Sequence, residues 1–576
     1  MTFAPGVADP LAHAAAKRNP QSPAGGSIIE DGLTARTGQV EAMLAESVAA
    51  SIETAFDGGD FNSGRAGGVS MTPPDVGIAV GPNHAVETVN LRMYVYDRAG
   101  NLLAATSLAT FFGSLQSGYN TISDPRMLYD APSGRWFLTL IGLNTTTNTG
   151  AIWVATSTSN DPTGTWNEWG YADSGRLPDY PGIGISNDKF VIATNEFTVV
   201  GGTVGAFLGV KFIAIRKADL VAGAISPSTS VSQTLSAGPI QPAQSMSSTN
   251  DLFMLSQDTS TTGSFWTVTG EPGVSVSYVR TGVSLAATTP PAAQQPSTST
   301  TIDTGDNRLQ RAVWRNGKLW AAGGSGCTFN GDATTRSCIH IVAVDTATGS
   351  VLQETRFGAA GAYYFYPALQ TDSSGNLFVV FGRSSTSVYA ELRTTVQLTT
   401  DSALGASTLL RAGVADYICS WCSPVSPSRY GDFFGAAVDP SSPQNVWVAG
   451  EYAKAGTTPS CAGCSATDNW GTWIALISVP VPATASSPSS IAAGGSISVS
   501  WSGVPTPTST DWVGVYPSGA ADQGGRILYQ YTSGAASGSM NVAIPISTAG
   551  GTYEVRLFAN NAYTRLAVGN SFTVIP

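Results

Sequence analysis

The stretch Asp179-Tyr180-Pro181-Gly182-Ile183-Gly184-Ile185 shows the pattern that decides the fold, in which a polar or aromatic motif runs directly into a short apolar strand. The pattern recurs between residues 73 and 432 at intervals of roughly 50 to 65 residues, slightly longer than a typical four-stranded propeller blade. We call these seven segments the opening motifs: Pro74-Asp75, Ser123-Asp124-Pro125-Arg126, Asp179-Tyr180-Pro181, Gln241-Pro242-Ala243-Gln244, Asp306-Asn307-Arg308, Tyr364-Phe365-Tyr366-Pro367 and Arg429-Tyr430-Gly431-Asp432.

Each opening motif is followed by a predicted hairpin. Residues 126–129 and 135–138, for example, are short apolar strands on either side of a turn that contains Pro132 and Gly134. If every motif begins the innermost strand of a blade, all of them lie at one end of a central channel. We therefore predict an all-β fold, with a seven-bladed β-propeller over residues 60–479.

The segments that flank the propeller have different compositions. Residues 1–59 are predicted to be an N-terminal extension that is disordered to about residue 30 and forms one helix over residues 37–56, because apolar side chains recur there every four positions. The seventh blade reaches the Ala/Ser/Pro-rich linker 480–486 with three strands. We therefore expect a segment before Met71 to supply its fourth strand.

A second small β domain follows over residues 487–576. Its predicted strands at 497–501, 512–516 and 553–558 have the spacing of a β-sandwich. With Asp511-Trp512-Val513-Gly514-Val515-Tyr516, it resembles the immunoglobulin-like modules attached to many secreted bacterial proteins. That resemblance implies either a spacer or an accessory that binds a glycan or a surface.

The composition of the chain limits the classes of partner that it is expected to bind. The chain of 576 residues is 12% charged and has a net charge of −11, which would repel a phosphate backbone, so nucleic acid is not an expected partner. No apolar run is long enough for a membrane span, and the first residues do not have the pattern of a signal peptide. Six cysteines and few lysines favour a secreted or cell-surface protein, which we expect to be a monomer.

The opening motifs concentrate carboxylates on one predicted face. Second strands of a blade end on that same face, and two of them end in Glu196 and Glu451. Glycoside cleavage requires two carboxyl groups on either side of a sugar, so the candidate catalytic pairs are Asp179 with Glu196 and Asp432 with Glu451. The expected substrate-binding residues are Asp75, Asp124, Arg126, Tyr180, Asp306, Arg308, Tyr364, Tyr366 and Arg429.

Three functions fit this face. The first is an extracellular glycoside hydrolase that acts on a polysaccharide or other glycan. The second is a polysaccharide lyase, in which a Tyr or His removes a proton beside an acidic sugar's carboxylate. The third is a non-catalytic glycan- or protein-binding propeller, because aspartates at strand starts also cap turns.

Three resemblances bear on the propeller prediction. Ser159-Asn160-Asp161-Pro162-Thr163-Gly164-Thr165-Trp166 resembles the Asp box of sialidase-type propellers, an outer turn motif, although its glycine is shifted by one place. Arg126, Arg308 and Arg429 are similar to the sialidase arginine cluster, but the Arg-Ile-Pro order of that family is absent. A set of secreted bacterial propeller proteins, mostly without assigned activity, is resembled by four segments together: Pro82-Asn83-His84, Asp124-Pro125-Arg126, Asp179-Tyr180-Pro181 and Arg429-Tyr430-Gly431-Asp432.

The cysteines form three local pairs. Cys327 and Cys338 flank one loop and are predicted to form a disulfide. The pairs Cys419/Cys422 and Cys461/Cys464 are each separated by two residues and could form two disulfides or one tetrahedral zinc site. Disulfides are favoured for an extracellular chain, so no metal site or cofactor is expected, and calcium binding among the acidic loops is left open.

Overall fold

The computed structural model describes residues 27–31, 49–64, 71–419, 422, 425–456, 470–504 and 507–576. These residues are almost entirely β, which confirms the all-β prediction. The described helices are short: α2 (Leu108–Phe111), α3 (Gly113–Gln116) and α4 (Lys217–Ala222). The chain divides into two compact units, and the boundary between them falls between Ser478 and Val479.

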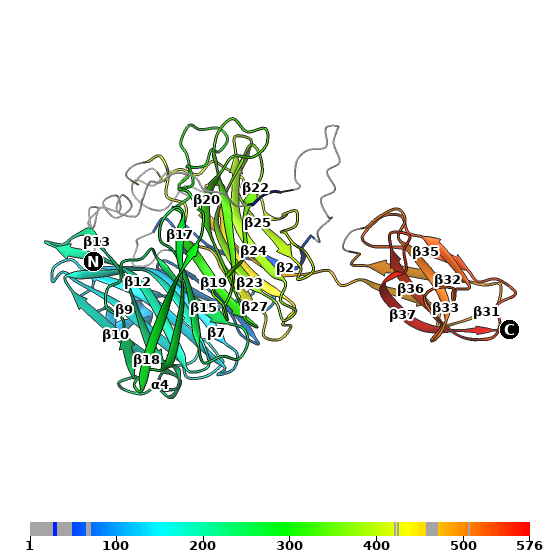
Figure 1. Ribbon diagram of the computed structural model, residues 1–576, viewed down its shortest axis with the longest axis horizontal. Helices are drawn as coiled ribbons and strands as arrows, with labels where there is room; N and C mark the ends of the chain where they lie inside the picture. Colours follow the sequence, from blue (N-terminus) through cyan, green and yellow to red (C-terminus); the bar gives the residue numbers. More distant parts are fainter. Residues whose placement is uncertain are drawn as a thin grey trace. The chain divides into compact units, whose positions relative to one another are not determined.

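The first unit contains four separate four-stranded sheets (Figure 1). In hydrogen-bonded order, the first two sheets are β3 (Gly77–Val80), β4 (His84–Val89), β5 (Arg92–Asp97) and β6 (Leu102–Ser107); and β10 (Trp166–Ser174), β9 (Thr149–Ser157), β8 (Arg135–Asn144) and β7 (Thr121–Asp130). The other two sheets are β23 (Ala362–Thr371), β24 (Leu377–Ser385), β25 (Val388–Gln397) and β26 (Thr408–Arg411); and β2 (Ser51–Asp60), β29 (Trp470–Ser478), β28 (Val446–Ala453) and β27 (Gly435–Val438).

The remaining strands of this unit form one 13-stranded sheet that contains three further antiparallel groups. Parallel pairing of β11 with β15, and of β15 with β19, joins the groups into one sheet. The groups are β11 (Arg176–Ile185), β12 (Lys189–Val200), β13 (Thr203–Arg216) and β14 (Thr229–Val231); β15 (Ile240–Ser245), β16 (Leu252–Gln257), β17 (Thr262–Glu271) and β18 (Ser275–Ser284); and β19 (Leu309–Arg315), β20 (Lys318–Cys327), β21 (Arg336–Asp345) and β22 (Val351–Gly358), with β1 (Ser27–Glu30) parallel to β22.

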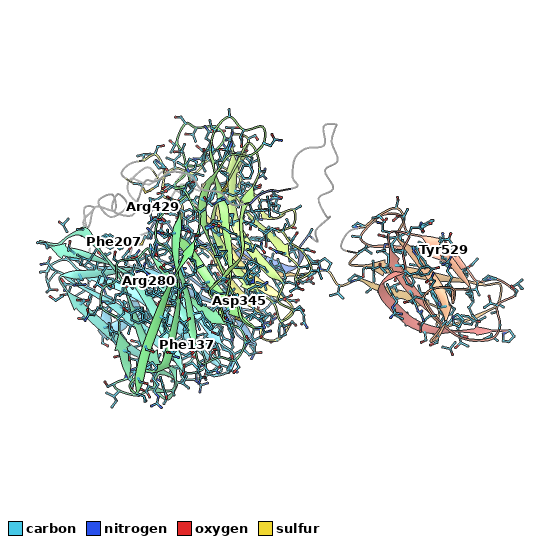
Figure 2. All side chains as sticks on the ribbon, viewed as in Figure 1. Phe137, Phe207, Arg280, Asp345, Arg429 and Tyr529 are labelled. Carbon is cyan, nitrogen blue, oxygen red and sulfur yellow. A yellow bond between two sulfur atoms is a disulfide. The ribbon has the colours of Figure 1, made fainter. Side chains whose placement is uncertain are left out.

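The first strand of each group contacts the first strand of the next. The order is β3, β7, β11, β15, β19, β23 and β27, and β27 contacts β3 again, so these inner strands form a closed ring. Apolar cores lie between neighbouring groups. Phe137 of β8, for example, which is labelled in Figure 2, stacks on Phe190 of β12 at 5.2 Å between ring centroids.

The ring is completed by the N-terminal strand β2. It hydrogen-bonds to β29, so a segment before Met71 does supply the outer strand of the last sheet, as expected. The predicted helix is wrong where it can be checked, because Ile52 and Phe56 lie in β2; its residues 37–48 are outside the described residues. A spacing of four also places side chains on one face of a strand, and Phe56 packs on Tyr96 and Trp447.

The N-terminal disorder was predicted to extend further along the chain than it does in the structure. Ser27–Glu30 form β1, and the buried Asp31 that follows accepts hydrogen bonds from the Tyr364 hydroxyl at 2.9 Å and the Ser407 amide at 2.8 Å. These contacts fix the residues after β1 against β23 and the segment before β26. A short polar segment of this kind carries no periodic signal in the sequence.

The second unit consists of two sheets with a shared apolar core that includes Val499, Val513 and Leu557. Part of the predicted linker belongs to this unit, because residues 483–486 lie in its first strand. The sheets are β30 (Ala483–Ser487), β32 (Ser496–Ser502) and β35 (Gly538–Ala543); and β31 (Ser490–Ala492), β37 (Thr564–Ile575), β36 (Gly551–Ala559), β33 (Trp512–Pro517) and β34 (Leu528–Tyr531).

Candidate functional site

Four opening motifs share an uncommon backbone conformation. Asp75, Asp124, Tyr180 and Tyr366 have positive φ angles of 53°, 56°, 52° and 52°, which non-glycine residues rarely adopt. At the last three, a proline follows and the strand register shifts, so each motif is a bulge at the start of an inner strand. Bulges redirect side chains, and these strained positions require support from their surroundings.

Asp75 links the first, second and last sheets of the ring. Its Oδ1 accepts a 2.9 Å hydrogen bond from the Asp432 amide, and its Oδ2 accepts a 2.7 Å bond from Asn90 Nδ2. Asn90 Oδ1 in turn accepts a 2.8 Å bond from the Asp124 amide. These bonds hold two of the positive-φ residues in place.

The three arginines of the opening motifs are already engaged. Arg308 forms a bidentate pair with Asp306 at 2.7 and 2.6 Å, and Arg429 Nη2 lies 2.7 Å from Asp432 Oδ2. Arg126 donates to the Pro181 carbonyl at 3.0 Å, and its guanidinium lies 3.3 Å from the centre of the Phe433 ring. Neither Arg308 nor Arg429 therefore offers a free fork to a substrate carboxylate.

Tyr180 lies between two of these cations. The guanidinium of Arg126 is 5.3 Å and that of Arg308 is 4.5 Å from the centre of its ring. Burial raises the pKa of the Tyr180 hydroxyl, although both arginines oppose the shift. Tyr180 is therefore a neutral phenol at physiological pH and stacks with cations rather than acting as a base.

Two carboxyl groups of this cluster favour the protonated form. Burial raises the pKa of Glu451 well above its usual value, and the charge of nearby Asp75 adds to the shift. The pKa of Asp75 is also raised well above its usual value, by burial and by the neighbouring Asp432 and Asp124. Both Glu451 oxygens are buried without a hydrogen-bond partner, an environment that disfavours the charged form.

The two predicted catalytic pairs have different placements. Asp179 is directly opposite Asn195 in the β11–β12 ladder, whereas Glu196 is opposite Pro178, so Asp179 and Glu196 project to opposite faces of the sheet. Glu196 instead lies 3.1 Å from Lys211 Nζ. Asp432 and Glu451 lie in one cluster, because both influence the pKa of Asp75 or are influenced by it.

The other predicted site residues also lie either inside this cluster or outside it. Tyr366 belongs to the cluster, where burial and the charges of Asp303 and Asp432 raise its pKa. Tyr364 does not, because its hydroxyl binds Asp31. The carboxylate cluster is therefore made of Asp75, Asp124, Arg126, Tyr180, Asp306, Arg308, Tyr366, Arg429, Asp432 and Glu451, together with Asn90 and Phe433.

The carboxylate cluster is closed rather than open. Most of its members are buried, and the side chains of Arg429 and Asp432 are 22% and 12% exposed. We expected these carboxylates to be exposed at a channel mouth, but they are packed in a compact network. Among the described residues, no group of three or more His, Cys, Asp or Glu has the geometry of a metal site.

A cavity of about 430 Å³ lies at the other end of the inner strands. Its walls come mainly from the last residues of β3, β7, β15 and β27 and from the turns that follow. They also include Gln244, the last residue of the fourth opening motif, and Arg311, the third residue of β19. The lining combines an apolar floor with hydroxyl and amide groups. Its residues include Ile78, Leu128, Tyr129, Asp130, Asn187, Lys217, Gln244, Ser245, Ser247, Ser248 and Arg311.

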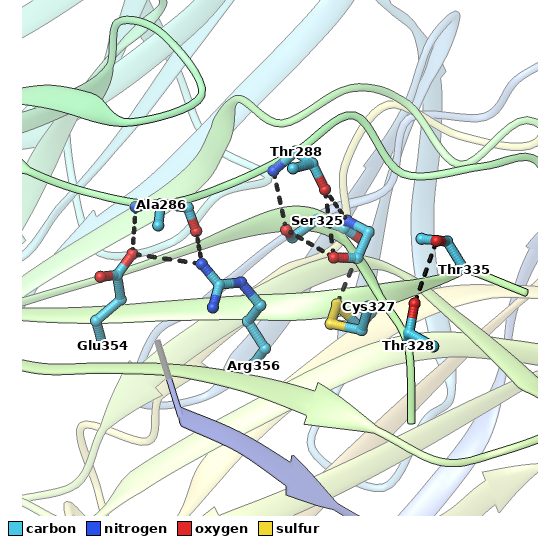
Figure 3. Close-up of a disulfide and its surroundings, with 10 residues drawn as sticks. Ala286, Thr288, Ser325, Cys327, Thr328, Thr335, Glu354 and Arg356 are labelled. Carbon is cyan, nitrogen blue, oxygen red and sulfur yellow. Dashed lines mark hydrogen bonds and ion pairs between the residues drawn. A yellow bond between two sulfur atoms is a disulfide. The ribbon is translucent and has the colours of Figure 1, made fainter. Parts of the chain in front are cut away.

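The described disulfides agree with the cysteine prediction. Cys327 pairs with Cys338 between the neighbouring strands β20 and β21, and Cys419 pairs with Cys422. Figure 3 shows the first bridge beside Ser325, whose hydroxyl accepts a hydrogen bond from the Thr288 amide at 3.1 Å. Cys461 and Cys464 lie outside the described residues.

Comparison with known proteins gives no family. No family model and no curated protein matches this chain. Solved structures with similarity include a protein of unknown function from Dyadobacter fermentans (12% identity, TM-score 0.33, covering 61% of this chain and 94% of that one). Others are Drosophila semaphorin 2a (9%, 0.32, 87% and 96%) and the Hadza microbial sialidase Hz136 (11%, 0.31, 64% and 71%). Function is therefore inferred from geometry alone.

Some residues of the carboxylate cluster and of the cavity were not predicted from the sequence. Asn90 follows the second strand of its sheet, and Phe433 directly follows an opening motif; neither residue type at such a place signals a site. Arg311 lies two residues inside β19, where an arginine looks like any outward-facing strand residue. The alternation of side chains along β19 could have placed it on the channel side.

Proposed function

We propose that this protein is an extracellular seven-bladed β-propeller that binds a glycan without cleaving it. The seven four-stranded groups would be the blades, and the second unit would be an immunoglobulin-like accessory. Two disulfides are consistent with an extracellular location, and no described helix is long and apolar enough to cross a membrane.

The observation that carries this proposal is the content of the cavity. Serine hydroxyls and the amides of Asn187 and Gln244 complement the hydroxyl groups of a sugar. Pro132, Met246 and Pro440 are not buried and offer apolar surface to its ring. Asp130 is the acidic residue of the described lining, and it lies 3.3 Å from Lys217 Nζ. A hydrolase that uses two carboxyl groups would lack its second group there.

A panel of soluble polysaccharides and oligosaccharides tests this function. Binding is measured by calorimetry, and hydrolysis and elimination are measured as new reducing ends and as unsaturated products. We expect at least one glycan to bind with no product formed. Gln244→Ala and Asn187→Ala should weaken binding, whereas Asn376→Ala, in a turn outside the cavity, should not. If no glycan of the panel binds, the proposal is contradicted.

A hydrolase is the second candidate, and Glu451 is the observation that favours it. Burial and the charge of Asp75 raise the pKa of Glu451 well above its usual value, as a general acid requires, and Asp432 lies in the same cluster. In that case Glu451→Gln and Asp432→Asn should each abolish product formation while binding persists. Glycan cleavage that survives both substitutions would remove this candidate, as would the absence of any product.

A further inference from the structure

Arg311 differs from the arginines of the carboxylate cluster. It lies on the inner strand β19 and lines the cavity, where it is half-buried. Its one described hydrogen bond runs from Nη2 to the Ala436 carbonyl at 3.3 Å. Among the described residues no carboxylate lies within ion-pair distance of Arg311, whereas Arg308 and Arg429 each have one at 2.6 and 2.7 Å.

The charge of Arg311 is retained although it is unfavourable. Burial lowers the pKa of its guanidinium to about 10, and the positive charge of Arg126 contributes to the shift. At neutral pH the group is still a cation, with four of its five N–H donors outside the bond to Ala436. A desolvated cation without a counter-ion is costly, so the cavity is electrostatically suited to an anion.

Other groups of the cavity fit the same ligand. Lys217 is already paired with Asp130 and does not neutralise a second anion. The Ser245 hydroxyl is buried without a hydrogen-bond partner, which leaves a donor for a ligand oxygen. A planar carboxylate matches the planar guanidinium fork with two parallel hydrogen bonds.

We propose that the cavity selects a carboxylate-bearing sugar, whose carboxylate binds Arg311 and whose hydroxyl groups bind the serine and amide side chains around it. This inference rests on the proposed binding function and adds the chemical class of the ligand. It places the acid-recognition residue on the inner strand β19, among residues that do not belong to the carboxylate cluster.

Glucuronate and glucose are suitable probes because they differ only in the carboxylate. We expect the full-length protein to bind glucuronate at least tenfold more tightly than glucose in calorimetry. Arg311→Met and Arg311→Lys should weaken glucuronate binding by roughly tenfold to a hundredfold, since charge-assisted bidentate bonds are lost, and should thereby remove the preference for glucuronate over glucose. Arg315→Gln, on the same strand but outside the described lining, is the matched control.

A second measurement does not depend on the ligand. Arg311→Met removes an uncompensated cation, so it should raise the Tm of the free protein, whereas glucuronate should raise the Tm of wild type only. Equal binding of glucose and glucuronate would overturn this inference and leave glycan binding intact. If neither probe binds and no glycan of the panel binds, the proposed function fails as well.

Discussion

The amide of Gly59 donates a 2.8 Å hydrogen bond to Glu87 Oε2, and this bond joins the N-terminal strand β2 to β4 of the first sheet. Glu87 also accepts a hydrogen bond from the Tyr96 hydroxyl at 3.3 Å. Thr472 of β29 donates to the Gly59 carbonyl at 3.0 Å. The point where the ring closes is therefore a three-way contact around one buried carboxyl group.

Glu87 should make the stability of the ring depend on pH. Burial raises the pKa of Glu87 to about 7, so the folded protein favours the protonated acid. The stabilisation is complete below the unfolded pKa of 4.5, is lost as pH rises toward 7, and amounts to roughly 3 kcal/mol. Thermal melts of wild type and Glu87→Gln between pH 5 and 8 should diverge, with the variant less sensitive. Parallel curves would contradict this.

Docking of β2 can be tested with one methyl group. A Cβ added at Gly58 would lie 2.4 Å from Thr472 Oγ1 and 2.6 Å from Glu87 Oε1. Gly58→Ala should therefore lower the free energy of unfolding by roughly 1–3 kcal/mol in urea titrations. Gly282→Ala is the control, because nothing lies within 4 Å of its added Cβ. Equal stability of the two variants would show that β2 is dispensable.

The carboxylate cluster contains an ion pair that should be expensive to break. Asp306→Asn leaves the buried Arg308 without its bidentate partner, so we expect a loss of roughly 3–5 kcal/mol. The pair of Asp522 with Arg565 is more exposed, and Arg565→Gln should cost at most about 1 kcal/mol. Chemical denaturation of both variants gives the comparison. A small effect at Asp306 would mean that the cluster tolerates an unpaired arginine.

The two described disulfides should contribute unequally. Cys327–Cys338 closes a loop across 11 positions and Cys419–Cys422 across three, so chain entropy predicts about 3 and about 2 kcal/mol. Replacing each pair by serine and measuring unfolding without reductant should rank the variants in this order. The reverse order would mean that Cys419–Cys422 stabilises more of the structure than the turn that it closes.

The sequence predicted the inner strands well because each one combines an apolar run with a distinctive motif and a turn. Outer strands such as β10 and β18 were not predicted, since their exposed, mixed residues have no buried face to reveal them. Residues in contact across the ring were only partly foreseen. Asp75 and Asp432 are 357 positions apart, and their hydrogen bond follows from ring closure rather than from any local pattern.

The candidate site was predicted less well for a related reason. The prediction that the second strands end at Glu196 and Glu451 was wrong, because β12 continues to Val200 and β28 continues to Ala453. One position of register also decides which face a side chain occupies. Glu196 consequently pairs with Lys211, whereas Glu451 enters the carboxylate cluster. Burial is also invisible in a list of charged residues, so the sequence suggested an open mouth where the side chains are packed.

The pairing of β2 with β29 has a consequence for synthesis of the chain. The ribosome makes β2 first, yet its partner ends at Ser478, more than 400 positions later. At 5–20 residues per second, β2 would wait for roughly 20–80 s before it could pair. The early segment must therefore avoid other sheet edges during this interval, and Asp57 and Asp60 give its end the negative charge that discourages such pairing.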